Sequence, residues 1–118
     1  MTAISLTLPT DPEYRGVATL VLGGIGARLD LSYERMDELQ LAVLTLLDAG
    51  VGPDVSVVVD ADGSTLTVAV GPVVDGSASD KGITTVLDRL VDGVEVDQRD
   101  GREWLALRLT GVGPTTAA

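Results

Sequence analysis

Cysteine, histidine and phenylalanine are absent from this chain of 118 residues. Without cysteine the chain can form neither disulfides nor thiolate metal sites. Without histidine it lacks the commonest metal ligand and the usual base of Ser-His and Cys-His nucleophiles. Aromatic residues make up only 3% of the sequence, so Val, Leu, Ile and Ala must fill the core. We therefore predict no nucleophilic triad and no metal site.

Basic residues are also scarce, since 8 Lys and Arg face 18 Asp and Glu, a net charge of −10. Nucleic acids and anionic membranes require clustered cations, so neither is predicted as a partner. A basic surface of another protein suits this charge better. The sequence has no apolar run of transmembrane length, and residues 1–9 lack the basic and apolar segments of a signal peptide. We expect a cytoplasmic location.

The stretch 32–50 predicts the central helix. Ser32 is a suitable N-cap, because its hydroxyl can accept a bond from a free N–H of the first turn. Apolar residues then recur at intervals of three and four, which is typical of one helical face: Met36, Leu39, Val43, Leu46 and Leu47. Leu41, Ala42 and Leu44 extend the apolar surface to the other sides. We therefore expect the second half of this helix, including Leu46 and Leu47, to be buried.

The remaining segments predict strands and two further helices. Residues 3–8, 55–60, 65–70, 94–97 and 104–109 alternate between apolar and polar, as half-buried strands do. Residues 12–28 and 81–91 have helical apolar spacing, the latter at Ile83, Val86, Leu87, Leu90 and Val91. The order β-α-α-β-β-α-β-β predicts an α+β fold, a two-layer sandwich with three helices on one face of a mixed, mostly antiparallel five-stranded sheet. We expect one domain over residues 1–110 and a disordered tail over 111–118.

The helix at 12–28 contains a glycine-rich segment, GGIG, at residues 23–26. A phosphate-binding loop is one interpretation, but no Lys-Ser/Thr pair follows and the GxGxxG spacing is absent. Close helix packing or a local kink is the alternative, and the sequence favours it. The apolar face of this helix is predicted to be Val17, Leu20, Val21, Ile25 and Leu29.

Three segments resemble the anti-sigma-factor serine kinases, which belong to the histidine-kinase-like ATPase (Bergerat or GHKL) fold. They are LPTDPEY at residues 8–14, LQLAV at 39–43 and RLVDGVEVD at 89–97. The resemblance extends over about residues 3–110. It implies a sigma factor or an anti-sigma antagonist as the partner, and it implies ATP and magnesium as the cofactors of an intact member.

The resemblance also implies that the nucleotide site is degenerate. In the family, the second helix carries a Glu base and, four residues later, an Asn that holds magnesium. The corresponding positions are Thr45 and Ala49. The adenine-binding Asp-x-Gly-x-Gly motif falls at residues 70–74, which contain no acid, and the glycine-rich lid is reduced to Gly82. We therefore expect no catalytic residue, no cofactor-binding residue and no bound ATP.

Three functions are open on these grounds. The first is a non-catalytic regulator that binds a sigma factor or an anti-sigma antagonist through a kinase-like scaffold. The second is an ATP-dependent serine kinase with a divergent site that uses the displaced acids Asp48 and Asp75. The third is a dimerisation or interaction module unrelated to sigma factors.

Five residues are candidates for partner binding. Trp104 points outward from the last strand and would suit a homodimer through the open face of the sheet, because aromatic anchors concentrate interface energy. Cover by a neighbouring loop or by the tail is the alternative for this residue. Asp75 lies in the irregular stretch 71–80, and Glu34, Asp37 and Glu38 form an acidic run that suits a basic partner.

Overall fold

A computed structural model describes residues 3–111 of the chain. The elements in chain order are β1 (Ala3–Pro9), α1 (Arg15–Arg28), α2 (Tyr33–Asp48), β2 (Asp54–Asp62), β3 (Thr65–Val73), α3 (Lys81–Leu90), β4 (Gly93–Arg99) and β5 (Arg102–Leu109). Short 3-10 turns, η1 (Pro12–Tyr14) and η2 (Ser77–Ser79), precede α1 and α3. The predicted α+β class and element order are confirmed. Apart from Gly111, the predicted disordered tail lies outside the described residues.

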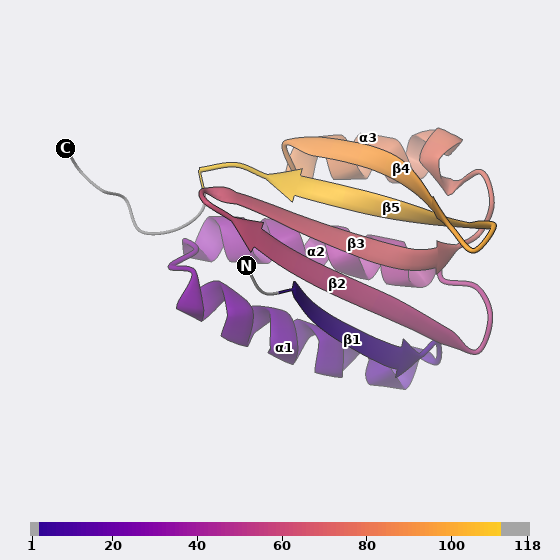
Figure 1. Ribbon diagram of the computed structural model, residues 1–118, viewed down its shortest axis with the longest axis horizontal. Helices are drawn as coiled ribbons and strands as arrows, with labels where there is room; N and C mark the ends of the chain where they lie inside the picture. The colour runs from indigo at the N-terminus through magenta and orange to yellow at the C-terminus, as the bar shows by residue number, and fades with distance from the viewer. Residues whose placement is uncertain (1–2, 112–118) are drawn as a thin grey trace.

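The five strands form one sheet in the order β1-β2-β3-β5-β4 (Figure 1). Every pairing in it is antiparallel. Two-residue turns close the hairpins β2–β3 and β4–β5, and each contains a glycine in the left-handed region, Gly63 at φ 61° and Gly101 at φ 75°. A glycine adopts this conformation without the steric cost of a Cβ, which suits it to both turns.

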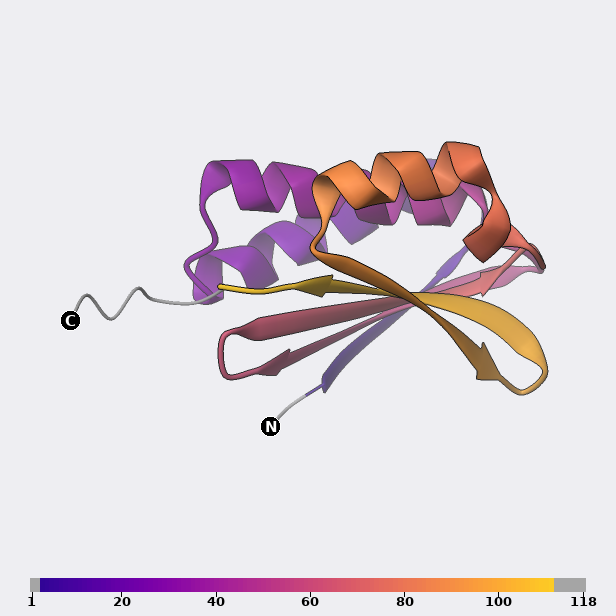
Figure 2. The same cartoon turned by 90° about the horizontal axis from the view of Figure 1, so that it is seen from above.

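The three helices lie on one face of the sheet, with α2 between α1 and α3 (Figure 2). Leu46 and Leu47 of α2 are 0% and 4% exposed, which confirms their predicted burial. The core opposite α2 comes from alternate residues of the three central strands, Val55, Val57, Val59, Leu66, Val68, Val70, Leu105, Leu107 and Leu109. Among residues 3–111, no helix is both long and apolar enough to cross a membrane.

The predicted starts of α2 and α3 are confirmed by their side-chain caps, whereas the helix predicted from residue 12 begins as the 3-10 turn η1 and becomes α-helical at Arg15. Ser32 Oγ accepts a hydrogen bond from Arg35 N–H at 3.1 Å, and Asp80 Oδ1 accepts one from Ile83 N–H at 3.1 Å. Each bond satisfies an N–H that has no partner within its helix. The apolar face predicted for α3 is wrong at Val86, which is 42% exposed. The buried face of this helix centres instead on Leu87.

The predicted apolar face of α1 is wrong in part. Ala18, Leu22 and Gly26 are the buried residues of this helix, whereas Val17 and Leu20 are 42% and 78% exposed. The cause is close packing at Gly26, because a Cβ there would lie 1.7 Å from Cε of Met36 in α2. This contact turns the small-residue side of α1 toward α2. The packing interpretation of the GGIG segment is thus confirmed at Gly26, with the helix continuous through all three glycines.

Candidate functional site

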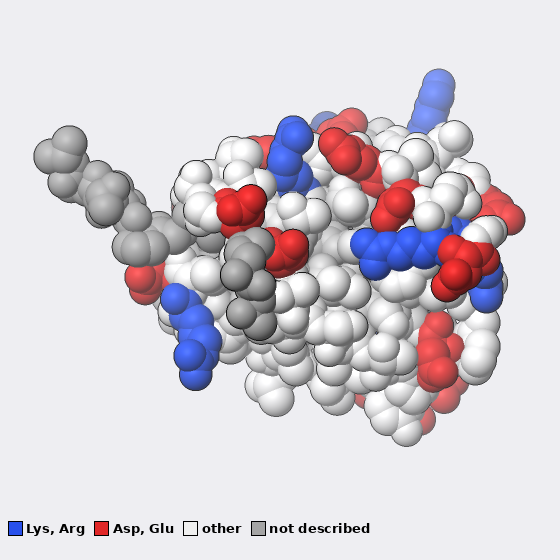
Figure 3. All heavy atoms as spheres, viewed as in Figure 1, with Lys and Arg blue, Asp and Glu red and all other residues white. Residues whose placement is uncertain are grey.

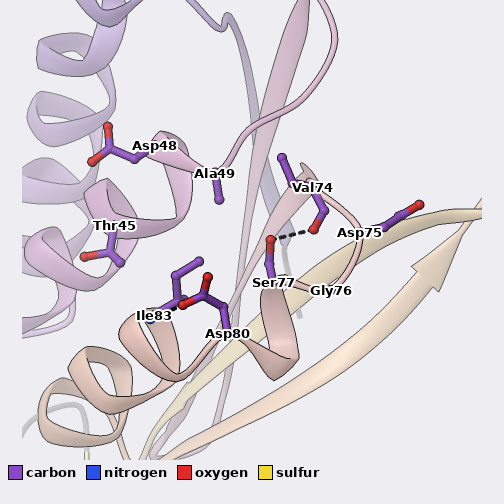
Figure 4. A pocket seen from close by; sticks show the side chains of 9 residues that line it. All are labelled: Thr45, Asp48, Ala49, Val74, Asp75, Gly76, Ser77, Asp80 and Ile83. Atoms are coloured by element: carbon purple, nitrogen blue, oxygen red, sulfur yellow. Dashed lines mark hydrogen bonds between the residues drawn. The ribbon is translucent and has the colours of Figure 1, made fainter.

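A pocket of about 480 Å³ lies between the end of α2, the segment after β3 and the start of α3 (Figure 4). Its wall is apolar at Ala49, Val74 and Ile83, and three aspartates stand around it. The residues that line it are Thr45, Asp48, Ala49, Val74, Asp75, Gly76, Ser77, Asp80 and Ile83. The structure therefore brings together Thr45, Ala49, Asp48 and Asp75, which the sequence singled out from segments far apart along the chain.

Backbone pairing to the end of α2 fixes one side of this pocket. Val51 N–H donates to Pro72 O at 3.0 Å, and Val74 N–H donates to Ala49 O at 2.9 Å. β3 therefore continues to Val73, past a shift in its register with β5 between Val70 and Val73. The stretch 71–80, predicted to be irregular, is strand in its first part and a 3-10 turn at 77–79.

Glu103 of β5 holds the other side of the pocket, and the sequence analysis missed it. The residue is only 8% exposed, and its two carboxylate oxygens accept hydrogen bonds from Gly76 N–H at 3.0 Å and Ala78 N–H at 2.9 Å. These bonds, with a smaller contribution from the N–H of Ser77, hold the pKa of Glu103 below its usual value, although burial opposes the shift. The alternation of β5 could have revealed it. Successive residues of a strand point to opposite faces, so Glu103 points to the same face as the inward-facing Leu105, Leu107 and Leu109.

The three aspartates of the pocket do not converge on one point. Asp48 pairs with Arg15 of α1, and Asp80 accepts the capping bond at the start of α3. Figure 4 shows Asp75 pointing away from both of them. Within residues 3–111, no three acidic side chains are grouped as a metal ion requires. The negative charge of this pocket is therefore spread around its rim.

Thr45 and Ala49 offer little to a metal ion or a base. Thr45 Oγ1 donates to Leu41 O of its own helix at 2.8 Å, and a hydroxyl does not ionise near neutral pH. Ala49 presents a methyl group at the pocket wall. Magnesium prefers carboxylate and other hard oxygen ligands, so these two positions supply neither the base nor the ligand that the resemblance would require.

Trp104 lies half-buried on the open face of the sheet and does not line the pocket. One side of its ring packs on Gly71 of β3, where a Cβ would come within 2.4 Å of the indole. The guanidinium of Arg99 stacks on the ring, 4.5 Å from its centroid, and Arg99 also pairs with Asp97. Neighbouring residues of the sheet thus cover much of this tryptophan.

The acidic run lies on the first turns of α2. Glu34 and Asp37 are exposed, whereas Glu38 is half-buried and 3.4 Å from Arg35 Nη1. Arg35 Nη2 also bonds Asp92 at 2.6 Å. Among residues 3–111, neither Glu34 nor Asp37 forms a salt bridge. These two carboxylates are therefore available to a basic partner, and Glu38 is already engaged.

Comparison with known proteins finds similarity over part of the chain. Part of the chain is similar to serine-protein kinase RsbW. The protein of that name from Oceanobacillus iheyensis is 45% identical over 40 residues, and the one from Bacillus velezensis is 35% identical over 40 residues. In both cases the match covers 34% of this chain and 25% of the relative. No family model matches the chain. The similarity supports a relationship to RsbW over this segment.

Proposed function

We propose that this protein is a non-catalytic regulator of the anti-sigma type, which binds a sigma factor or an anti-sigma antagonist. Two lines support the proposal. One is the similarity to serine-protein kinase RsbW over about a third of the chain. The other is the pocket at the end of α2, which is lined by Thr45 and Ala49, the two residues that the resemblance aligns with a base and a magnesium ligand. Neither side chain can fill that role, and this supports the loss of catalysis.

The pocket also fits ATP poorly on electrostatic grounds. Asp48, Asp75 and Asp80 surround it and no Lys or Arg lines it, although Asp48 is paired with Arg15 of α1 outside the lining. A triphosphate without bound metal would meet these carboxylates directly, and like charges at short range repel. Magnesium bound to the triphosphate would offset only part of this repulsion, and Ala49 offers no ligand atom to hold the ion in the pocket. The side chains present therefore do not fit magnesium-ATP, and we derive no kinase step from them.

We expect no measurable ATP binding at millimolar nucleotide with magnesium present. The reason is the missing ligand at Ala49 together with the acidic rim. Isothermal titration calorimetry measures this directly, and an intact RsbW kinase handled in the same way serves as the positive control. A micromolar affinity for ATP that is lost in the Asp48→Asn or Asp75→Asn variant would instead support the divergent kinase.

Partner binding is expected to depend on Glu34 and Asp37, because both carboxylates are exposed and suit a basic surface. Tagged protein in native cell extract should capture a sigma factor or an anti-sigma antagonist at low salt. Capture should weaken at high salt, since charges on protein surfaces are screened over about 8 Å at physiological ionic strength. The Glu34→Gln/Asp37→Gln variant should capture several-fold less of that protein.

A matched control removes the same charge elsewhere. Asp88→Asn/Glu95→Gln alters two exposed acids on α3 and β4 and should capture as much as the wild type. Trp104→Ala and Asp75→Asn test the two remaining candidate contacts in the same assay. Failure to capture any sigma factor or antagonist at either salt concentration would contradict the regulator and favour the unrelated interaction module.

A further inference from the structure

The pocket at the end of α2 has an apolar wall between carboxylates that stand apart (Figure 4). Ala49, Val74 and Ile83 supply the apolar surface. Asp75 and Asp80 lie beside it, both are exposed, and among residues 3–111 neither forms a salt bridge. The volume of about 480 Å³ is sufficient for a small organic molecule. A ligand that matches this lining combines an apolar body with positive charge.

The backbone beside the pocket is not available to an anion. Successive N–H groups in a turn can form a concave site for a phosphate or a carboxylate. In the turn 76–78 the carboxylate of Glu103 already occupies that site, since it accepts bonds from Gly76 N–H at 3.0 Å and Ala78 N–H at 2.9 Å. The N–H of Ser77 donates to Val74 O at 3.1 Å. An anionic ligand would therefore find no free N–H donor in this turn.

Glu103 also places a negative charge behind the pocket wall. Its side chain is 8% exposed, and the bonds from the turn hold its pKa below the usual value, so the group is ionised at neutral pH. In the part of the chain that the structure describes, no Lys or Arg forms a salt bridge with it. Buried charges are screened much less by salt than exposed ones. The field of Glu103 therefore favours a cation on the other side of the turn.

We propose that this pocket binds a linear aliphatic polyamine, with its methylene chain on the apolar wall and its ammonium groups at Asp75 and Asp80. A metal ion requires acidic ligands that converge on one point, and the acids of this pocket are not grouped in that way. A polyamine carries its charges apart, with apolar segments between them, so the same separation suits it. Each ammonium group can donate charge-assisted hydrogen bonds to a carboxylate. The inference rests on the proposed loss of the ATP site, because a nucleotide would otherwise fill the pocket.

Isothermal titration calorimetry with spermidine tests this proposal. At low salt the wild type should bind spermidine in a one-to-one complex with a dissociation constant below about 1 mM. The Asp75→Asn/Asp80→Asn variant should bind about tenfold more weakly, because two charge pairs are lost. Asparagine at position 80 still offers an oxygen to Ile83 N–H, so the cap of α3 is kept. The control Asp88→Asn/Glu95→Gln removes the same net charge outside the pocket and should bind as the wild type does.

A second pair of variants tests the apolar wall and does not depend on the stability of the first pair. Val74 is 53% exposed, so Val74→Ser should leave the fold intact and weaken spermidine binding several-fold by removing apolar contact. Val96→Ser is the matched control, since Val96 of β4 is 55% exposed and lies outside the pocket lining. In NMR spectra of the wild type, spermidine should shift the amide signals of Ser77 and Ile83, which line the pocket.

The alternatives give different results. Equal weakening by the two pairs of charge substitutions would overturn the site, because spermidine would then respond only to the net charge of −10. Displacement of spermidine by an equal concentration of magnesium would replace the polyamine by a metal ion. Displacement by a lysine-rich peptide at lower concentration would assign the pocket to a side chain of a partner protein. A wild type that does not bind spermidine overturns this inference alone, whereas micromolar binding of ATP would overturn the non-catalytic regulator as well.

Discussion

Replacing Leu46 by alanine is expected to lower the free energy of unfolding by about 2–5 kcal/mol. Leu46 has no exposed surface and lies in α2 between the sheet and the two flanking helices. Its removal takes apolar atoms out of the core and leaves a cavity that close-packed neighbours can fill only partly. Leu47 is 4% exposed, and its replacement by alanine should lower the free energy of unfolding by an amount in the same range. Urea denaturation followed by circular dichroism measures both changes.

Leu41 provides the control for this measurement. It lies one turn before Thr45 on the same helix, and it is 47% exposed. The Leu41→Ala substitution is the same chemical change with the same change in helix propensity. We expect it to lower the free energy of unfolding by less than about 1 kcal/mol. Equal losses at Leu41 and Leu46, or a loss below about 1 kcal/mol at Leu46, would show that α2 does not occupy the centre of the core.

The Glu103→Gln substitution is expected to destabilise the protein by about 1–3 kcal/mol at neutral pH. A glutamine presents one carbonyl oxygen and one NH2 group where the carboxylate presents two acceptors. One of the N–H donors of Gly76 and Ala78 would then face another donor. Because the wall of the pocket depends on these bonds, the amide protons of Gly76 and Ala78 should also exchange faster with solvent, which hydrogen-exchange NMR can follow.

This effect of Glu103 should depend on pH in a defined direction. The pKa of Glu103 is lowered in the folded state by the bonds from Gly76 and Ala78, so ionised Glu103 stabilises the fold. The full contribution is present above the ordinary glutamate pKa of about 4.3, and it is lost as the pH falls through the lowered pKa of the folded state. The difference in stability between wild type and Glu103→Gln should therefore narrow below about pH 4.

A control at the exposed Glu95 distinguishes the effect of Glu103 on stability from general acid denaturation. Asp92 also has a lowered pKa, because its carboxylate accepts a bond from Thr110 N–H and pairs with Arg35, so the wild type will lose stability in acid for more than one reason. Glu95→Gln removes the same charge at an exposed position on the neighbouring strand and serves as the control. A difference between wild type and Glu103→Gln that stays constant down to pH 3 would contradict the assigned role.

Periodicity alone determined the elements that have two distinct faces. The spacing of Leu39, Val43 and Leu46 predicts a helix with a defined inner side, and the alternation of Val55, Val57 and Val59 predicts a strand in one register. Shifting the helix or the strand by one residue would expose apolar side chains, so one orientation of each element is strongly preferred. The hairpin turns follow equally from the chain, because Gly63 and Gly101 adopt the required positive φ at little cost.

Helix α1 shows where this reasoning stops. It is apolar all round, so every rotation about its axis buries similar side chains, and its sequence pattern cannot select one face. Contact between Gly26 and Met36 of α2 makes the selection, and it leaves Leu20 exposed. That exposure exists only once the two helices are packed.

The pocket depends in the same way on long-range contacts. The sequence marked Thr45 and Ala49 through a resemblance and Asp48 and Asp75 as acids, but it could not place them beside Asp80 and Ile83 of α3. Nor could it pair Glu103 with Gly76 and Ala78, which lie 27 and 25 positions earlier in the chain. Local sequence patterns report on neighbours within a few residues, whereas these bonds form only when β5 and the segment after β3 are brought together by the sheet. The sequence by itself thus determined the order and inner faces of the regular elements, and the tertiary structure decided the rotation of α1 and the wall of the pocket, because both depend on contacts between segments that no local pattern connects.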